Sequence, residues 1–332
     1  MKSSINVAVV GTGYWGKNHV RIYKSLEDSG TIRFKRICDA NAVTRQKIAE
    51  QYRLESTGNY KEILNDPEID AVSLCTPNDT HYKLGMEFLK AGKNLLIEKP
   101  LALTFEEAEQ LTKFAEKEKL ILMVGHVFRF NPLVRKLKEE FTKGSLGDVY
   151  LLAANRTCLY PPKRECGVII DLAIHDIDIT LYLLDEKLPK KIHATGGSFL
   201  GKKFEETAFI ALDFDGITSY IFASWLFPNK VRETWVIGNK AEVHLDYVSE
   251  KMRMFEDVII PNAYSEFEVQ NGPCKEFFFE KQEPLKLELT HFVESVKRHQ
   301  QPEVDGHIAS RVIKVCEIAT KSLLKQRPLV VE

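Results

Sequence analysis

The chain lacks a long apolar run, a basic block and a signal peptide. Its longest hydrophobic stretches are of strand length, far short of the roughly 20 residues that cross a bilayer. The formal net charge is -1, and lysines and arginines do not cluster, which disfavours nucleic acid and anionic membranes as main partners. Because the N-terminus runs directly into an apolar segment at 5–10, we expect a cytoplasmic protein.

The chain also lacks a cysteine framework, an internal repeat and a low-complexity segment. Its six cysteines are scattered and form no Cys-x-x-Cys motif, so they indicate neither a metal site nor a disulfide scaffold. What is present is an ordinary globular composition, 44% hydrophobic and 28% charged. A length of 332 residues favours two domains.

Over the first third, short apolar segments alternate with amphipathic ones. Such alternation predicts βαβ units and a parallel sheet covered on both faces. We therefore expect a doubly wound Rossmann domain over 1–124. The predicted strands are 5–10, 32–38, 71–75, 94–97 and 121–124, and the predicted helices are 14–26, 42–52, 60–64, 80–91 and one capped by Thr104.

After Gly125 strand-like segments follow one another, and Asp215-Gly216 indicates a hairpin turn. We expect an α+β domain over 125–332 with an open, mostly antiparallel sheet. Its predicted strands are 149–156, 191–198, 207–214, 217–224, 234–237 and 241–247, and its predicted helices are 132–141, 171–184, 285–299 and 306–325. The last two helices could pack on either domain, and the sequence assigns no role to 257–283.

A glycine-rich turn, Gly11-Thr12-Gly13-Tyr14-Trp15-Gly16, follows the first predicted strand and opens the first helix. Glycines at this spacing permit a tight turn, the approach of a pyrophosphate and close helix packing, and the helix N-terminus faces the phosphates. Asp39 ends the second predicted strand and is placed to bind the ribose hydroxyls. No arginine follows it directly, which favours NAD over NADP, although Arg45 could complicate that choice.

Glu98-Lys99-Pro100 follows the apolar run 95–97. Open α/β sheets bind ligands outside the carboxyl ends of their strands. A lysine held there beside apolar walls can have its pKa lowered and take part in proton chemistry. The proline restricts Lys99 to extended backbone, and the bond between them could be cis. The simpler interpretation is a polar turn after a strand.

Asp171 and His175 lie four residues apart on a predicted helix that reads as largely buried. That spacing places a carboxylate and an imidazole on one face. They could act together on a substrate, or they could be a satisfied core pair in which Asp171 caps the helix. Asp176 and Asp178 lie on other faces, where solvated or structural roles are expected.

Together these features resemble one family: the glucose–fructose oxidoreductase, inositol dehydrogenase and rhizopine-catabolism group of NAD(P)-dependent oxidoreductases. Two further motifs support the resemblance, Thr76-Pro77-Asn78-x-x-His81 and Arg129-Phe130-Asn131-Pro132. The likeness covers nearly the whole chain. It implies a Rossmann domain followed by a domain whose open sheet mediates dimers or tetramers, and a Lys99–Pro100 bond that is often cis.

The resemblance also implies site residues. Lys99, Asp171 and His175 match the catalytic positions of the family. Substrate contacts are expected from these three together with Arg129, Asn131, Arg156 and Arg164. The cofactor is expected to contact Gly11, Gly13, Tyr14, Trp15, Gly16, Asp39, Thr76, Pro77, Asn78, His81, Glu98 and Lys99. No metal is expected.

Oxidation of a secondary alcohol requires loss of the hydroxyl proton as hydride leaves for nicotinamide. His175 is the candidate base, since an unperturbed imidazole pKa of about 6.5 suits the task. Asp171 would orient its ring, and Lys99 would favour the developing alkoxide. The roles of Lys99 and His175 could be exchanged.

Within the family, 13–19 and 125–132 look most like members that act on nucleotide-linked amino sugars, the UDP-N-acetylglucosamine 3-dehydrogenases. A diphosphate would need cations, and Arg156, Lys163 and Arg164 flank the loop before the predicted catalytic helix. These three residues could equally be plain surface charge. The alternative enzyme oxidises myo-inositol or a free sugar. Two further alternatives are an NAD-binding regulator and NAD-dependent glycoside cleavage.

Overall fold

The computed structural model describes residues 4–163, 165–262 and 266–331. The chain divides into two compact units, one comprising Met1–Phe130 and Gln282–Ile313 and the other Asn131–Lys281 and Lys314–Glu332. Helix α8 (Pro284–Arg298) therefore belongs to the first unit, and α9 (Gly306–Lys325) begins in the first and ends in the second. Within the described residues, no helix is both long and apolar enough to span a bilayer.

The first unit is built on a six-stranded sheet, ordered β3-β2-β1-β4-β5-β6. All of its strand pairs are parallel. β1, β4, β5 and β6 are almost wholly buried, as expected for a sheet covered on both faces. The strands are β1 (Asn6–Val10), β2 (Arg33–Cys38), β3 (Ser56–Thr57), β4 (Ala71–Leu74), β5 (Asn94–Glu98) and β6 (Leu122–Gly125).

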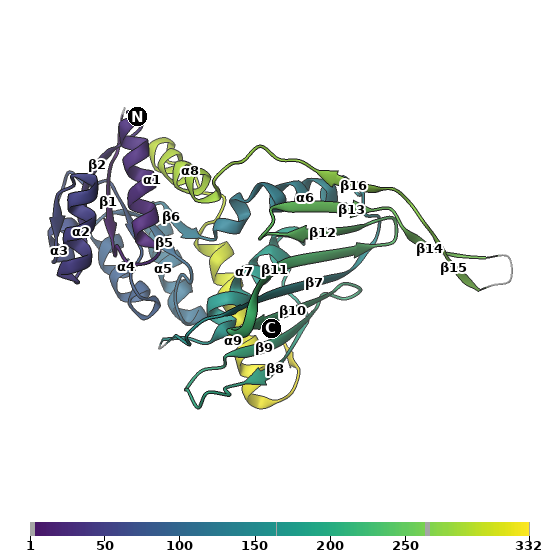
Figure 1. The fold of residues 1–332 in the computed structure, drawn as a ribbon. Coiled ribbons are helices and arrows are strands. Elements are labelled where there is room, and N and C mark those ends of the chain that lie inside the picture. Colours follow the sequence, from purple (N-terminus) through teal and green to yellow (C-terminus); the bar gives the residue numbers. More distant parts are fainter. Residues whose placement is uncertain (1–3, 164, 263–265, 332) are drawn as a thin grey trace. The chain divides into compact units, whose positions relative to one another are not determined.

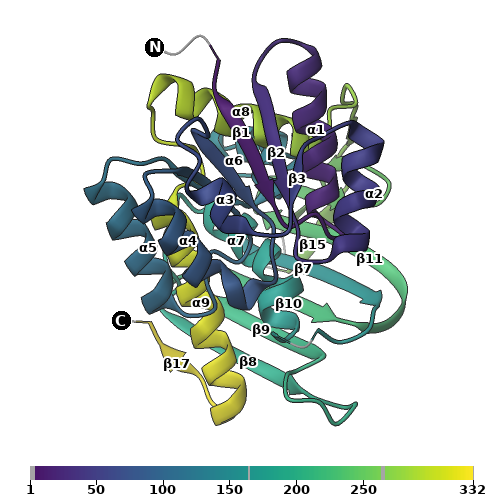
Figure 2. The same cartoon turned by 90° about the vertical axis from the view of Figure 1, so that its left-hand side faces the viewer.

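Helices cover both sides of this sheet (Figure 2). α1 packs against α2 and α8, whereas α4 packs against α5; right-handed crossovers place these two groups on opposite faces. Thr104 caps α5 by accepting a hydrogen bond from the Glu107 N–H, as predicted. The helices are α1 (Gly16–Asp28), α2 (Ala42–Tyr52), α3 (Tyr60–Leu64), α4 (His81–Lys90) and α5 (Phe105–Lys117), with 3₁₀ turns η1 (Asn78–Thr80) and η2 (Val127–Phe130).

The second unit contains a nine-stranded sheet, ordered β16-β13-β12-β11-β7-β10-β9-β8-β17 (Figure 1). Only the β7–β10 pair is parallel. Asp215 and Gly216 both have positive φ and form the predicted β9–β10 turn. The strands are β7 (Val149–Leu159), β8 (Lys191–Gly197), β9 (Thr207–Asp213), β10 (Thr218–Ser224), β11 (Leu226–Gly238), β12 (Glu242–Asp246), β13 (Lys251–Phe255), β16 (Cys274–Phe277) and β17 (Leu329–Val330).

The two sheets confirm the predicted fold class, an N-terminal Rossmann fold followed by an α+β domain with a mostly antiparallel sheet. Several strands of the second sheet escaped prediction wholly or in part. β13 and β16 border a segment for which the sequence indicated no regular structure, and β11 is longer than the predicted 234–237. Strands with one exposed face carry a weaker hydrophobic signal than the buried strands of the first unit.

One face of the large sheet packs on helix α7 (Ile174–Leu183), which in turn packs on α6 (Pro132–Thr142). A π-helical turn, Ile169–Ala173, leads into α7, where the sequence pattern indicated one regular helix from residue 171. Asp176 and Asp178 are 2% and 1% exposed, so of the two roles expected for them, solvated or structural, the structure agrees with the structural one. The core of this unit lies between α7 and the sheet.

The other face of the large sheet carries aromatic side chains. The register sets Phe209 opposite Phe222, and Phe222 opposite Asn155. The Phe209 and Phe222 rings stack at 4.3 Å, and Phe209, Tyr220 and Phe227 are 52%, 54% and 44% exposed. We call this the outer face.

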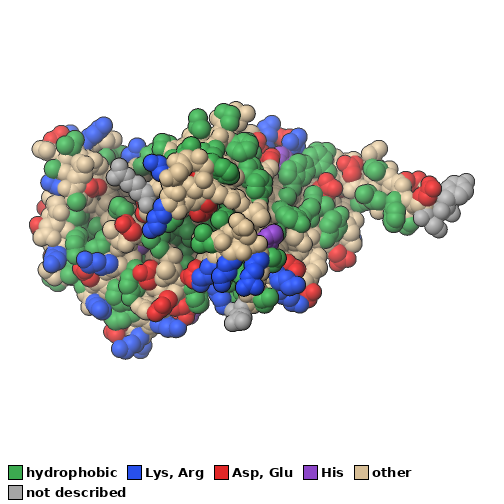
Figure 3. Space-filling model, turned by 90° about the horizontal axis from the view of Figure 1, so that it is seen from below, with side chains coloured by type: hydrophobic (Ala, Val, Ile, Leu, Met, Phe, Trp, Pro, Cys, Tyr) green, Lys and Arg blue, Asp and Glu red, His purple; other side chains and the backbone are tan. Residues whose placement is uncertain are grey.

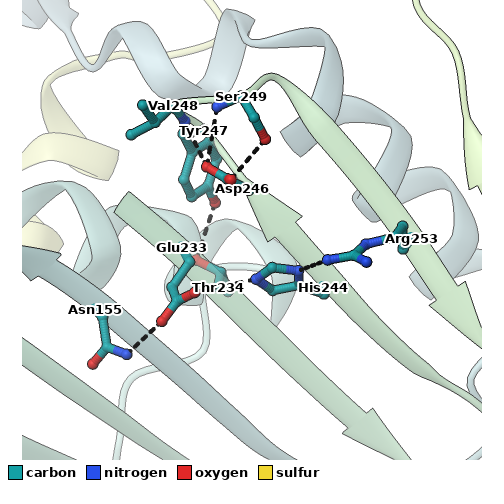
Figure 4. Close-up of polar contacts among 9 residues, drawn as sticks. All are labelled: Asn155, Glu233, Thr234, His244, Asp246, Tyr247, Val248, Ser249 and Arg253. Carbon is teal, nitrogen blue, oxygen red and sulfur yellow. Dashed lines mark hydrogen bonds and ion pairs between the residues drawn. The ribbon is translucent and has the colours of Figure 1, made fainter. Parts of the chain in front are cut away.

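A polar cluster continues the outer face across β7, β11, β12 and β13 (Figure 4). The Asn155 amide donates to Glu233 at 2.7 Å, and His244 Nε2 lies 3.2 Å from the other Glu233 oxygen. Arg253 approaches His244 Nδ1 at 3.4 Å. The indole of Trp235 stacks on the His244 ring at 4.2 Å, so this part of the face is partly covered by its own side chains.

Strands β14 (Val258–Pro261) and β15 (Phe267–Gln270) lie within segment 257–283 and pair as a separate two-stranded hairpin. We call this hairpin the arm. It extends from the sheet of its unit, with hydrophobic and acidic side chains along it (Figure 3). The register places Ile259 opposite Val269 and Pro261 opposite Phe267, so these four residues share one face. Ile259, Val269 and Phe267 are 65–76% exposed.

Candidate functional site

The three glycines of the β1–α1 turn meet three different surroundings. Gly11 has φ +89°, and an added Cβ would lie 2.5 Å from the Cys75 carbonyl oxygen. At Gly16 an added Cβ would lie 2.0 Å from the Gly11 oxygen. Gly13 instead faces open space, with no heavy atom within 4 Å of an added Cβ. The outer glycines thus permit the turn and the helix packing, whereas Gly13 leaves room for a phosphate to approach the backbone.

α1 begins with two of its N–H groups bonded within the loop, that of Lys17 to the Gly13 carbonyl at 3.2 Å and that of Asn18 to the Trp15 carbonyl at 2.8 Å. Its N-cap residue, Trp15, makes no side-chain capping bond. The first N–H groups of a helix need an acceptor, and the helix dipole favours an anion there. The turn therefore fits the pyrophosphate of a dinucleotide.

Asp39 lies just beyond β2, and its carboxylate is tied to the glycine-rich turn. One oxygen accepts hydrogen bonds from the Thr12 N–H at 2.7 Å and the Thr12 hydroxyl at 3.0 Å, and the other accepts from the Asn41 N–H at 2.8 Å. Arg45 donates to the Asp39 backbone carbonyl at 2.7 Å. Arg45 thus binds the backbone of Asp39 and not its carboxylate. This arrangement fits recognition of ribose hydroxyls.

Glu98 ends β5 and is 7% exposed. One carboxylate oxygen accepts from the Trp15 indole N–H at 2.5 Å and lies 2.8 Å from His19 Nε2. The other accepts from the Lys99 backbone N–H at 3.2 Å. A Cβ added at Gly125 would lie 2.8–3.0 Å from this carboxyl group, so a larger residue at position 125 would have to displace it.

Lys99 follows Glu98 and is half-buried beyond the carboxyl end of β5. The Lys99–Pro100 peptide bond is cis. The strand-end position agrees with the position predicted for the reactive amine, on the same sheet edge as the dinucleotide turn. Both β1 and β5 pair with β4 in parallel, which brings the two loops to one edge.

The sequence predicts a cofactor contact for His81, but both of its ring nitrogens lie next to backbone carbonyl oxygens. It is fully buried, with Nδ1 2.7 Å from the Pro100 carbonyl oxygen and Nε2 2.9 Å from that of Thr76. Burial lowers the pKa of His81, which outweighs the opposing effect of the two carbonyls. The imidazole therefore joins the loop after β4 to the loop after β5. Thr76 and Pro77 precede η1, and Asn78 begins it.

In the second unit, Asp171 lies on the π-helical turn and His175 on the first turn of α7. One Asp171 oxygen lies 2.7 Å from the Lys163 ammonium, and the other accepts from the Trp225 indole at 3.2 Å. The Asp171 carboxylate raises the pKa of Lys163 against the opposing effect of burial. π-helical turns are frequent at functional sites. His175 is half-buried.

The cations expected to bind substrate lie in different environments. Arg156 is 1% exposed and forms two hydrogen bonds to Asp176, at 2.6 and 2.8 Å. It holds α7 against the sheet, which disfavours substrate binding. Arg129 is also 1% exposed, Asn131 caps α6 by accepting from the Leu133 N–H at 2.9 Å, and Arg164 lies outside the described residues.

Sequence reasoning missed four residues that support these groups: Thr12, His19, Lys163 in its role beside Asp171, and Trp225. His19 lies on α1 and Trp225 lies between β10 and β11, and their spacing in the sequence carries no functional signal. Their partners lie 79 and 54 residues away in the chain.

Comparisons with known proteins agree with this geometry. Residues 5–126 match the model of an oxidoreductase family with an NAD-binding Rossmann fold, GFO/IDH/MocA. Residues 134–244 match the C-terminal domain of the same family. The protein is therefore an NAD(P)-dependent dehydrogenase of CH–OH groups. It belongs to the GFO/IDH/MocA family, as the motifs predicted.

The relatives act on different sugars and polyols. A UDP-N-acetylglucosamine 3-dehydrogenase of Acidithiobacillus ferrooxidans is 26% identical over 93% of this chain and 94% of its own. A myo-inositol 2-dehydrogenase of Thermotoga maritima is also 26% identical, over 99% of each chain.

Solved structures show the same fold. That of the A. ferrooxidans enzyme has a TM-score of 0.82 at 24% identity, covering 96% of this chain and 98% of its own. A levoglucosan dehydrogenase in complex with NADH has a TM-score of 0.84 at 18% identity, covering 99% of each chain. The match of residues 5–126 to an NAD-binding Rossmann family model confirms the predicted NAD cofactor.

Proposed function

We propose that this protein oxidises a secondary hydroxyl of a sugar, with C3 of a nucleotide-linked amino sugar such as UDP-N-acetylglucosamine as the first candidate. The observation that carries the proposal is the first-unit arrangement, in which the dinucleotide turn and Lys99 lie on one sheet edge. The A. ferrooxidans relative, which covers nearly the whole chain, supports the substrate.

Each proposed group has a chemical task. NAD, held by the β1–α1 turn and by Asp39, supplies the hydride acceptor when bound. His175 accepts the hydroxyl proton, and Asp171 favours the resulting imidazolium. Lys99 donates to the substrate oxygen and stabilises its developing charge. Lys99 and His175 belong to different units, so their convergence on one substrate is part of the proposal.

The residues proposed to touch substrate are Lys99, Asp171, His175 and Arg164, with Lys163 beside Asp171. A core position disfavours Arg156, so the proposed substrate site excludes it. Thr76, Pro77, Asn78 and the exposed Tyr14 are proposed to line the cofactor side.

A second candidate is a myo-inositol or free-sugar dehydrogenase, which the T. maritima relative supports at the same identity. A panel of UDP-N-acetylglucosamine, myo-inositol and free hexoses, assayed for NADH formation, separates the two. We expect NADH only with the sugar nucleotide, together with a 3-keto product detected by mass spectrometry. Reduction of NAD only by free polyols would contradict the nucleotide-sugar proposal.

We also propose a homodimer or homotetramer formed through the outer face of the nine-stranded sheet. Exposed aromatic residues in contiguous register support it, since exposed apolar patches mark interaction sites. The arm adds a second apolar surface from the same unit. A two-stranded hairpin is marginally stable alone, and burial of its apolar face against another copy would stabilise it.

A further inference from the structure

The Glu98 carboxylate contacts both the dinucleotide turn and the backbone N–H of Lys99. Its partners come from three segments: Trp15 in the turn, His19 on α1 and Lys99 after β5. The chain separations of 83 and 79 residues from Trp15 and His19 mean that tertiary packing alone brings them together. An ionised carboxylate only accepts hydrogen bonds, so all three partners donate.

This requirement assigns the His19 proton. Because Glu98 accepts, the proton of the His19–Glu98 bond is on Nε2. Nδ1 is buried and has no hydrogen-bond partner among the described atoms. The His19 ring is fully buried, so it cannot swing away without opening the packing of α1. Trp15, by contrast, is 37% exposed on the turn and depends on Glu98 to hold its indole N–H.

The neighbouring strand β6 also restricts the position of the Glu98 carboxyl group. β5 and β6 pair so that Glu98 lies opposite Gly125, and a side chain at Gly125 would collide with the carboxyl group. A buried, charged acceptor with three donors is well satisfied, whereas loss of the charge leaves donors without a matching acceptor.

We propose that Glu98 is a positioning residue that locks the dinucleotide turn to the Lys99 backbone. NAD seated on the turn then meets the Lys99 ammonium in a fixed relation, with the carboxylate as the shared anchor. The inference rests on the proposed function for the role of Lys99. The prediction for NADH binding does not rest on it, because the Glu98 carboxylate also holds the turn when no substrate is present.

Glu98→Gln tests the charge while keeping the shape. An amide offers one acceptor oxygen, so its NH₂ group must face a donor, either Lys99 N–H or one of the other two partners. We expect kcat at saturating NAD to fall about tenfold or more, and the Kd for NADH measured by titration calorimetry to rise severalfold. Glu140→Gln is the matched control, since Glu140 is a carboxylate of similar burial, 8% exposed, in the second unit; it should change neither quantity.

Trp15→Phe tests the positioning role of Glu98 even if Glu98→Gln folds poorly. It removes only the indole N–H from a partly exposed side chain. We expect a loss of kcat and of NADH affinity in the same direction, and no further loss when both substitutions are combined, because both break one linkage. A merely structural Glu98 would lower the melting temperature without this shared loss.

These measurements distinguish failure of the proposed function from failure of the positioning role of Glu98. If no sugar or polyol reduces NAD with the unaltered enzyme, the proposed function fails, while the NADH titrations still decide the role of Glu98. If Trp15→Phe and a folded Glu98→Gln both keep wild-type NADH affinity and kcat, the positioning role is wrong.

Discussion

Two buried carboxylates, Glu98 and Asp171, each accept a hydrogen bond from a tryptophan indole. An indole N–H is a donor without charge or acceptor capacity, so it fixes the rotamer of an acid without neutralising it. Each acid also has a basic partner, His19 for Glu98 and Lys163 for Asp171. Each unit therefore presents a rigidly held carboxylate next to a residue proposed to be catalytic, Lys99 in one and His175 in the other.

His175→Ala tests the proposed base. Removal of a general base typically lowers turnover by about 10²–10⁴-fold, and we expect a loss in that range with unchanged NADH affinity. Steady-state rates and an NADH titration measure the two effects. His193→Ala, at an exposed position of β8, is the control for loss of an imidazole. A turnover of His175→Ala within twofold of wild type would remove His175 from the mechanism.

At the scale of elements, the start of the helix that carries Asp171 depends on Glu205. Its carboxylate accepts from the Ile169 N–H at 3.1 Å, at the first π-helical residue. Gly167 permits the approach, because an added Cβ would lie 2.1 Å from the carboxyl group. Burial raises the pKa of Glu205 above its ordinary value. The acid thus caps the helix at the cost of being harder to ionise.

Glu205→Gln should make stability less sensitive to pH. Because the folded-state pKa of Glu205 is raised, its contribution to stability is full below its unfolded pKa, about 4.3, and is lost as pH rises through the folded pKa. A glutamine can still accept from Ile169. We expect the melting temperature of the variant, relative to wild type, to increase between pH 4 and pH 8.

Differential scanning fluorimetry across that range measures the effect, with Glu280→Gln at an exposed site of the same unit as the control. A constant difference between Glu205→Gln and wild type over the whole range would show that Glu205 titrates alike in the folded and unfolded chain.

At the scale of the whole molecule, the second unit has two exposed apolar surfaces. The aromatic row of the outer face spans β9, β10 and β11, and the arm presents Ile259, Val269 and Phe267. Burial of such area contributes roughly 25 cal/mol per Å², so association of copies would stabilise this unit.

Phe209→Asp should shift the protein to a smaller assembly. The aspartate would place a charge at one end of the aromatic row, next to the Phe222 ring on which Phe209 stacks, where burial without a partner is costly. Size-exclusion chromatography with light scattering measures the molar mass. Val43→Asp, at a 78% exposed position on α2 of the first unit, should leave the mass unchanged. An unchanged mass for Phe209→Asp would place any oligomer contact elsewhere.

Much of the fold follows from local pattern. Continuous apolar strands such as 94–98 and amphipathic helices such as α5 have a period that needs no tertiary partner to be recognised. The same holds for the three glycines, whose spacing reflects a backbone requirement. The segment at β14–β16 escaped prediction because strands exposed on both faces carry little hydrophobic alternation, and β17 is only two residues long.

The sequence by itself determined the Rossmann fold, the cofactor turn, the end-of-strand lysine and the family, because each depends on short-range spacing. Only the tertiary structure decided the tasks of polar side chains with distant partners. Arg156, a candidate for substrate, is paired with Asp176 in the core; His81, a candidate for the cofactor, joins two loops; and Glu98 anchors the turn to Lys99. A polar residue must be satisfied where it is buried, and which donor or acceptor satisfies it is set by packing between segments far apart in the chain.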